Sequence, residues 1–393
     1  MPLKTTDYTG ALDRDMLQEI ILQDMPHEAA LYSWLVARGQ TSKTGNVKVE
    51  WQTAPRPVKR TQIDNGGAAY DDTTTTLVVD DSSVFFPGAI ILCETGGERM
   101  LCLTVASSTQ ITVRRGVGVA AAAGGVANNT WLQVVGHASG EGSNFPDARL
   151  PLRSDVYNLI QQFKVPVEIT GDRRRSATLV ENEQGHQRKW ALKELVQLMG
   201  AAIIHGTRNS SATDSDGKIV KTMGGLRSVI STNVQNQAGT LTLAQFKTFC
   251  STYAFARGSS EKLFIMGPLL HDIVHTFYEN RLQVEQLTNA TGFRLSRLVT
   301  PSGDLLLVKD SALNGAFAGS GIVIDPERVQ LRHHPERDKN GNEVPGDDGM
   351  PVLKENLQLN GQDTSKEGYE ARLTLEYGDE NDHAHLYGVT AAA

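Results

Sequence analysis

The sequence predicts an α+β protein in which one long helix lies across a β-sheet and a small all-β domain is inserted. Three observations favour this class. A strand pattern that ends at Gly171 leads into a helical pattern that ends at Gly206. Residues 70–136 alternate short apolar runs with turn signals and show no helical period. Strand patterns also lie on both sides of a helical region at 241–286.

The long helix is the clearest of the expected elements. Before it, Val165, Val167 and Ile169 alternate with polar residues, which is typical of a half-buried strand. The helix is expected at about 184–206, where apolar residues recur at three- and four-residue spacing: Leu192, Leu195, Val196, Met199, Ala202 and Ile203. Such a helix would be roughly 33 Å long. Its single apolar stripe suits a helix that covers one face of a sheet.

The N-terminal residues 7–24 predict an amphipathic helix. One face of this helix is apolar, with Leu12, Met16, Ile20 and Ile21. Two interpretations remain open: the helix belongs to an arm that packs on a neighbouring copy, or it packs on the core of its own chain.

Two further elements are expected before the inserted domain. Residues 26–36 predict a second, short helix, and residues 41–45 predict a turn. The alternation of apolar and charged residues at 47–51 predicts a strand, which Pro55 stops.

The all-β pattern at 70–136 predicts a separate small domain. Its expected strands are 77–79, 89–94, 100–105, 111–113 and 131–135. About 67 residues give only a marginal core, so we expect the domain to lean on the rest of the chain or on a neighbouring subunit. Strand patterns flank it on both sides, which indicates an insertion.

The C-terminal half predicts a mixed α/β region. A polar loop is expected at 207–223, helices at 241–253 and 268–286, and buried strands at 263–266 and 305–308. Thr240 or Thr242 is a suitable N-cap for the first helix. The expected later strands are 322–324, 329–332, 353–359, 371–376 and 383–389. The first sheet is therefore completed by the C-terminus.

Composition limits the class of function. A formal net charge of −7 and a pI near 5.8 argue against a general nucleic-acid binder. Three cysteines without metal-ligand spacing support neither a disulfide framework nor a zinc site. The sequence has no signal-peptide pattern and no apolar run long enough to cross a bilayer, so we expect a cytoplasm-like compartment and no membrane.

The sequence offers little support for catalysis, a cofactor or a bound metal. The segment at 338–342 resembles the start of a calcium loop, but Gly349 stands where the final Glu is needed, so a solvated loop is expected. His383 and His385 share one face of an expected strand, yet no third ligand is near, so ordinary strand histidines are expected. No nucleophile elbow, phosphate loop or dinucleotide fingerprint is present.

The densest basic run offers a candidate contact surface. It comprises Arg173, Arg174 and Arg175, with Arg188 on the helix that follows. Four cations near the start of a helix oppose its dipole and need acidic partners. We expect these arginines to contact a neighbouring subunit; the alternatives are contact with nucleic acid and a solvated turn.

Several segments, in this order, resemble the major head proteins of tailed bacteriophages that carry a β-rich insertion. These segments cover most of the chain outside residues 70–136. Each is unspecific alone, and their order carries the resemblance. They are 34–35, 48–51, 163–171 with the long helix, 223–226, 307–310, and 360–363 before the strand at 370–376. The insertion itself resembles β modules of phage structural proteins at 87–88, 97–98 and 114–116.

The resemblance implies the Hong Kong 97-type capsid fold. In that fold the chain would divide into an N-terminal arm, 1–40; an extended loop with the insertion, 41–145; a peripheral domain, 146–222 with 320–393; and an axial domain, 223–319. The long helix at 184–206 would be the spine of the peripheral domain. No residue here matches a motif for the covalent crosslinks that some relatives form.

The resemblance also implies function and partners. Copies would form hexamers and pentamers of an icosahedral shell around double-stranded DNA, with scaffolding, portal and decoration proteins as further partners. The protein would be assembled in the host bacterial cytoplasm and end in the virion. The alternatives are a cellular nanocompartment shell, a phage tail or decoration protein that binds through its β module, and a hydrolase.

Overall fold

The structure is a computed structural model, and it describes residues 29–53, 59–118, 125–142, 153–175, 183–278, 283–286, 294–339, 343–344 and 349–392. The chain divides into two compact units, one of residues 1–51 with 155–393 and one of residues 52–154. One unit thus interrupts the other in sequence, as expected for an insertion. The helix expected at 7–24 lies outside the described residues.

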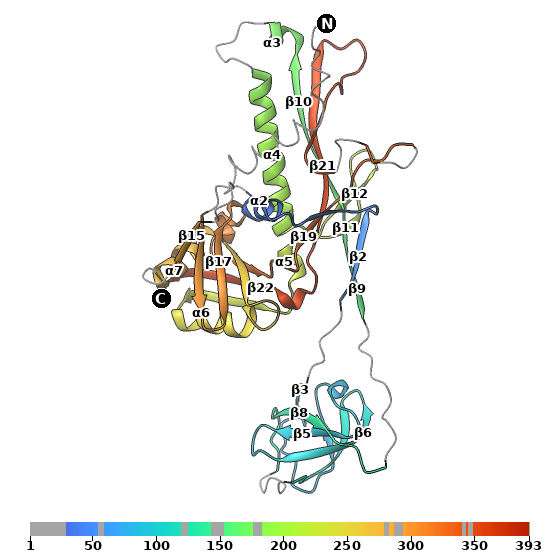
Figure 1. Cartoon of the computed structure of the whole chain (residues 1–393), viewed down its shortest axis with the longest axis vertical. Helices are drawn as coiled ribbons and strands as arrows, with labels where there is room; N and C mark the ends of the chain where they lie inside the picture. Colours follow the sequence, from blue (N-terminus) through green and yellow to red (C-terminus); the bar gives the residue numbers. More distant parts are fainter. Residues whose placement is uncertain are drawn as a thin grey trace. The chain divides into compact units, whose positions relative to one another are not determined.

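In the first unit the long helix α4 (Glu183–His205) packs on a five-stranded mixed sheet (Figure 1). The strand order is β1-β19-β21-β10, and β20 pairs with β21 beside β19. The strands are β1 (Thr41–Lys43), β10 (Gln161–Thr170), β19 (Gln330–His333), β20 (Val352–Lys354) and β21 (Thr364–Glu376). The C-terminal part of the chain therefore completes this sheet, which confirms the expectation. The turn expected at 41–45 is wrong, because β1 pairs in parallel with β19.

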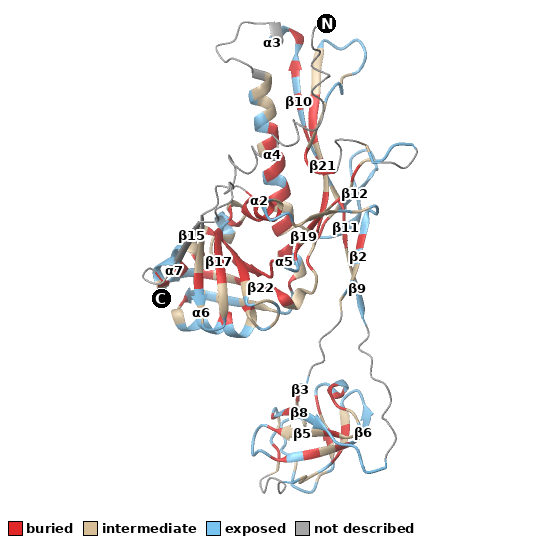
Figure 2. Cartoon of the chain, viewed as in Figure 1, coloured by how far each residue is buried: buried red, intermediate tan, exposed pale blue. Residues whose placement is uncertain are grey.

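Alternation along β10 explains why the helix and the sheet pack. The buried residues are every second one: Phe163, Val165, Val167 and Ile169. The matching stripe on α4 is Leu192, Leu195, Val196, Met199 and Ile203. Figure 2 shows buried residues on both elements. Pro166 is compatible with this strand because β10 is the edge of the sheet, where a missing backbone N–H leaves no central ladder bond unmade.

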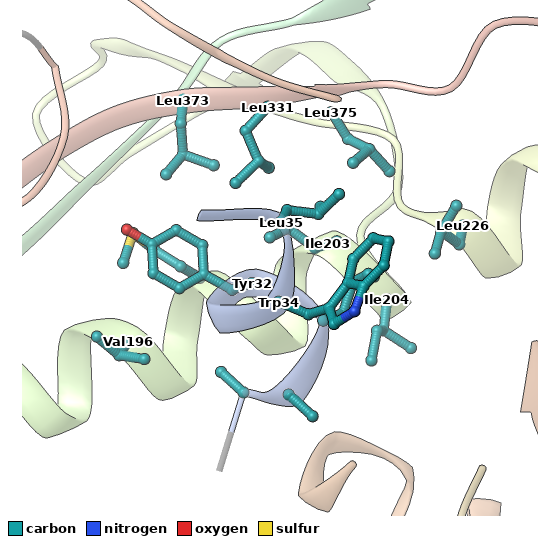
Figure 3. Packing of buried hydrophobic residues seen from close by; sticks show 14 of the residues in the cluster. Tyr32, Trp34, Leu35, Val196, Ile203, Ile204, Leu226, Leu331, Leu373 and Leu375 are labelled. Carbon is teal, nitrogen blue, oxygen red and sulfur yellow. The ribbon is translucent and has the colours of Figure 1, made fainter. Parts of the chain in front are cut away.

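Helix α2 (Ala30–Ala37) fills the space between α4 and the sheet. Its Tyr32, Trp34 and Leu35 are almost fully buried and lie near residues of α4, β19 and β21 (Figure 3). No side chain of α2 itself caps its first turn. Asp310 instead accepts a hydrogen bond from Leu31 N at 3.1 Å, so a distant loop caps the helix.

A seven-stranded sheet forms the rest of this unit, in the order β13-β22-β18-β14-β17-β16-β15. Its strands are β13 (Val234–Leu241), β14 (Glu261–Met266), β15 (Gln283–Gln286), β16 (Arg294–Thr300), β17 (Gly303–Lys309), β18 (Gly321–Ile324) and β22 (Ala384–Ala392). Successive residues of β14 contribute to two cores. Leu263 and Ile265 join the core of α4, whereas Phe264 and Met266 join a core with residues of α6 (Leu243–Phe249) and α7 (Pro268–Tyr278). The apolar runs expected to be buried strands are thus covered on both faces.

The predicted division of the chain differs from the structure at three points. Helix α2 was expected in the arm and β1 in the extended loop, but α2 packs in the core of α4 and β1 pairs in the sheet beneath it. Residues 320–393 were expected with the long helix, but β18 and β22 pair in the seven-stranded sheet. The reason is that a short apolar strand carries no information about which of two sheets it will join.

Short helices complete the unit, and they test the expected N-cap and the expected helix at 268–286. They are α3 (Gly171–Arg175), α5 (Leu226–Val229), α6 (Leu243–Phe249), α7 (Pro268–Tyr278), a π-helical turn (Cys250–Ala254) and 3₁₀ turns at Ser311–Leu313, Gly315–Phe317 and Glu380–Asp382. Thr242 forms a capping box with Gln245, which confirms it as an N-cap. The helix expected at 268–286 is too long, because α7 ends at Tyr278 and Gln283–Gln286 is a strand.

The expected loop at 207–223 is also wrong. It contains an exposed hairpin of β11 (Asn209–Thr213) and β12 (Ile219–Thr222). Asp214 accepts hydrogen bonds from the backbone of Asp216 and Lys218, which closes the turn. The polar composition of both strands hid them, because neither has a buried face.

The inserted unit is a six-stranded antiparallel sheet in the order β3-β8-β5-β6-β7-β4. Its strands are β3 (Arg60–Gln62), β4 (Thr76–Val78), β5 (Ala89–Cys93), β6 (Arg99–Ser107), β7 (Gln110–Arg114) and β8 (Trp131–His137), with a 3₁₀ turn at Ser82–Val84. Strands β2 (Lys48–Thr53) and β9 (Ser154–Leu159) pair separately. The sheet begins earlier than residue 70, and its buried apolar residues form a separate core, from Ile63 to Leu132.

Two glycines meet where α4 ends, and they give a first prediction. Gly225 N donates to Gly206 O at 2.9 Å, and a Cβ on Gly225 would lie 2.6 Å from Gly206 N. Gly225→Ala should therefore cost about 1–3 kcal/mol in the free energy of unfolding, measured in urea. Gly224→Ala is the matched control, because its Cβ would meet nothing closer than 3.5 Å. Equal losses for the two variants would contradict the prediction.

Candidate assembly surfaces

The arginines singled out in the sequence lie at the start of the helical layer. Arg173 is exposed on α3, and the side chains of Arg174 and Arg175 lie outside what the structure describes. Arg188, one turn into α4, is 32% exposed and bound within its own chain. The intersubunit contact expected for these residues stays a prediction.

Arg188 forms a two-pronged ion pair with β21. Its Nε and Nη2 donate to the two carboxylate oxygens of Glu367 at 2.7 and 2.9 Å, and Nη2 also reaches Glu355 at 2.9 Å. The Glu367 hydrogen bond raises the pKa of Arg188 above its ordinary value. This arginine therefore fastens the first part of α4 to the sheet.

A cationic pocket lies between the β11–β12 hairpin and the sheet, with a volume of about 600 Å³. Lys164 of β10, Lys218 and Lys221 of the hairpin, and Arg372 of β21 line it, and Asp214 is the one carboxylate in the lining. The sequence did not reveal this pocket, because its residues come from segments up to 325 positions apart, from Val47 to Arg372, and none belongs to a recognisable motif.

The cations of the pocket differ in how far they are neutralised. Arg372 pairs with Glu370 at 2.8 Å, and Lys218 pairs with Asp216 at 3.3 Å. Lys164 and Lys221 form no salt bridge with any residue that the structure describes. Lys164 nevertheless lies opposite Glu370 in the β10–β21 ladder, close enough for its charge to favour the ionised carboxylate. A chain with a net charge of −7 thus gathers four cations at one opening, two of them without a salt bridge in the described chain.

The outer face of α4 carries exposed apolar side chains. Trp190 is 74% exposed and Leu198 is 47% exposed. Eight residues turn a helix by about 80° beyond two full turns, so both side chains lie on the side of α4 that points away from the buried stripe. An exposed tryptophan of this kind is enriched at protein interfaces.

The histidines considered as metal ligands have structural roles. His383 Nδ1 accepts a hydrogen bond from Asp325 N at 3.1 Å, and its Nε2 donates to Tyr377 O at 2.7 Å. Both ring nitrogens are therefore used within the chain. His385 is 5% exposed and stacks on Tyr387. Across the described ranges, no three His, Cys, Asp or Glu side chains come together in a group that could hold a metal ion.

Lys262 is a further buried titratable group, and it too is saturated. Its ammonium donates to the carbonyl oxygens of Arg257 and Asp382, each at 2.6 Å. Burial lowers the pKa of Lys262 to about 8, against the opposing effect of Asp325 and Asp382. Lys262 therefore has a structural role, because its ammonium links two backbone segments.

No helix in the described part of the chain could span a bilayer.

Several solved structures contain a similar chain, at very low sequence identity. The satellite phage P4 procapsid including size determination (Sid) protein is 9% identical and covers 100% of this chain and 93% of that chain, with a TM-score of 0.42. Mycobacterium phage Bobi is 9% identical over 91% and 90%, with a TM-score of 0.42. The holo-SrpI encapsulin complex from Synechococcus elongatus PCC 7942 is 11% identical over 62% and 77%, with a TM-score of 0.40.

Comparison of the sequence with curated proteins and with protein-family models gives the clearer result. No curated protein matches the chain. A family model described as the SU10 major capsid protein matches residues 3–390, which is nearly the whole length. The described chain has the parts that the resemblance implied, namely a long helix on a sheet, a second mixed α/β sheet and an inserted β domain. The chain belongs to the SU10 major capsid protein family.

Proposed function

We propose that copies of this chain assemble without catalysis into hexamers and pentamers that tile an icosahedral phage head around double-stranded DNA. The match of the capsid-family model to residues 3–390 carries the proposal. Packing within the chain supports it: α4 is buried along the stripe that faces the sheet, and its opposite face exposes Trp190 and Leu198. A rigid helix with an apolar outer face suits a subunit that makes repeated contacts with its neighbours.

The net charge of −7 is compatible with a container for DNA. A wall with an excess of negative charge does not hold the packaged genome tightly, whereas a basic wall would. We propose further that scaffolding, portal and decoration proteins are the other partners, and that the head is assembled in the host bacterial cytoplasm.

The parts of the chain have proposed roles in the shell. Residues 1–40 would form the arm, 41–145 the extended loop with the insertion, α4 the spine of the peripheral domain, and 223–319 the axial domain. Strands β18 and β22 go with the axial domain in this scheme, because they pair in its sheet. Helix α2 and strand β1 go with the peripheral domain, because they pack in the core of α4 and pair with β19. Arg173, Arg174 and Arg175 would bind carboxylates of a neighbouring subunit.

Electron microscopy of the purified, expressed protein tests the proposal. We expect closed shells or capsomer rings, and heads from infected cells should protect double-stranded DNA from nuclease. Arg174→Glu should reduce the yield of shells, whereas Lys247→Glu, an exposed lysine on α6, should not. Monomers under every assembly condition would overturn the proposal. Unchanged assembly of Arg174→Glu would overturn the role of the arginines alone.

A further inference from the structure

We propose that the cationic pocket between the β11–β12 hairpin and the sheet receives residues 7–24 of a neighbouring copy. The inference rests on the proposed assembly and names the surface that would hold the arm. Two properties of the pocket point to this occupant: the excess of positive charge in its lining and the apolar side chains beside that charge. In addition, the buried Nδ1 of His334 in the pocket has no hydrogen-bond partner among the described residues.

Charge is the first argument. Lys164 and Lys221 are exposed and form no salt bridge within the described chain, and Arg372 and Lys218 lie in the same lining. Residues 7–24 contain five carboxylates and one arginine. Placing this segment in the pocket would give both lysines acidic partners in a partly enclosed site, where charge pairs are screened less than on an open surface.

Apolar surface is the second argument, and it separates an amphipathic protein segment from DNA. The hairpin contributes Ile219, 64% exposed, and Val220, 39% exposed, and Val47 opposite is 40% exposed. Residues 7–24 carry the complementary apolar face: Leu12, Met16, Ile20 and Ile21. A DNA backbone would pair with the lysines but would leave Val47, Ile219 and Val220 of the pocket in contact with water.

An unpaired histidine nitrogen is the third observation. His334 lines the pocket, and its Nδ1 is buried without a hydrogen-bond partner among the residues that the structure describes. A carboxylate or a backbone group of a docked segment could pair with it. Buried polar atoms in folded proteins almost always have such a partner.

A neighbouring copy fits the symmetry of a shell. An arm on one subunit and a pocket on the next form a heterologous contact, and such contacts close into rings when repeated by rotation. The same arm can therefore link every subunit of a capsomer to the one beside it. If the arm docked on its own chain, its carboxylates would still pair with the lysines, but the contact would not link one subunit to the next.

Charge reversal in the full-length protein tests the pocket. Lys164→Glu with Lys221→Glu should raise the concentration needed for assembly about tenfold. Asp13→Lys with Asp15→Lys should do the same, and the four changes together should restore assembly. Lys247→Glu with Lys309→Glu, exposed lysines outside the pocket, is the control and should assemble like the wild type. Urea unfolding of each variant is compared with that of the wild type, because Lys164→Glu places two like charges opposite each other at Glu370. Lys221→Glu alone, on the exposed hairpin, should fold like the wild type and still weaken assembly.

The outcomes separate this inference from the proposed function. Wild-type shells together with normal assembly of the pocket variants would overturn the docking while leaving the capsid role intact. Weaker binding of a double-stranded DNA probe with unchanged assembly would assign the lysines to nucleic acid and would also overturn it. The pair Asp15→Cys and Lys221→Cys, oxidised in assembled shells, should give a ladder of linked subunits on a non-reducing gel. Disulfides that form only within single subunits, with no linked dimers or larger species on the gel, would overturn the contact between copies.

Discussion

Replacement of Glu98 by Ala should destabilise the inserted unit by about 3–5 kcal/mol, the largest effect expected of any single substitution here. Glu98 is fully buried and Arg115 nearly so, with side-chain exposures of 0% and 6%. The carboxylate accepts from Arg115 Nε at 2.6 Å and from Nη2 at 2.7 Å. Arg115 Nη1 donates to the backbone oxygens of Asp71 and Thr74. Removing Glu98 leaves a buried guanidinium without its anion.

The physical reason is the cost of an unpaired buried charge. The hydrogen bond from Glu98 raises the pKa of Arg115, so the arginine stays charged and cannot escape the cost by losing its proton. Arg115 also ties the segment at 71–74 to the strand layer, so the loss should spread through the small unit.

The measurement is urea unfolding of the full-length protein, with hydrogen exchange at 59–142 to locate the loss. Glu94→Ala in the same unit is the matched control. Glu94 pairs with Arg60 at the surface, where the side chains are 31% and 48% exposed, so its loss should cost at most about 1 kcal/mol. Comparable losses for Glu98→Ala and Glu94→Ala would contradict the argument.

The parts of the fold that could be predicted from sequence are those with a periodic buried face. Val165, Val167 and Ile169 alternate, and Leu192, Leu195 and Met199 recur at helical spacing, because one side of each element faces a shared core. Packing imposes these periods, so the sequence reveals them. The strand β14 was likewise visible, since both of its faces are covered.

Elements without a buried face could not be found in this way. Strands β11 and β12 are exposed on both sides, so no period marks them. Strand β1 is three residues long, and its pairing with β19 depends on a segment 290 positions away. The candidate pocket was missed for the same reason. Lys164, Lys221 and Arg372 are ordinary surface residues in sequence, and only the fold brings them to one opening.

Acidification should destabilise the first unit through His385, by up to about 3 kcal/mol between pH 6.5 and 4. Burial lowers the pKa of His385 to about 4, and the nearby Arg227 and His205 add to the effect. In this window the unfolded chain binds a proton on His385 and the folded chain does not. Stability from this group is therefore full above pH 6.5 and is lost as the pH falls towards 4. Burial also lowers the pKa of His383, which acts in the same direction.

The free energy of unfolding of His385→Phe, followed from pH 7 to 4, isolates this contribution. Phenylalanine can keep the stacking on Tyr387, which lies 5.2 Å away between ring centroids, and it removes the buried Nε2 that has no hydrogen-bond partner in the described chain. The variant should lose less stability on acidification than the wild type. His275→Phe, at an exposed position on α7, should follow the wild-type curve. If His385→Phe and the wild type lost stability in parallel, the acid response would have to come from the carboxylates and not from this histidine.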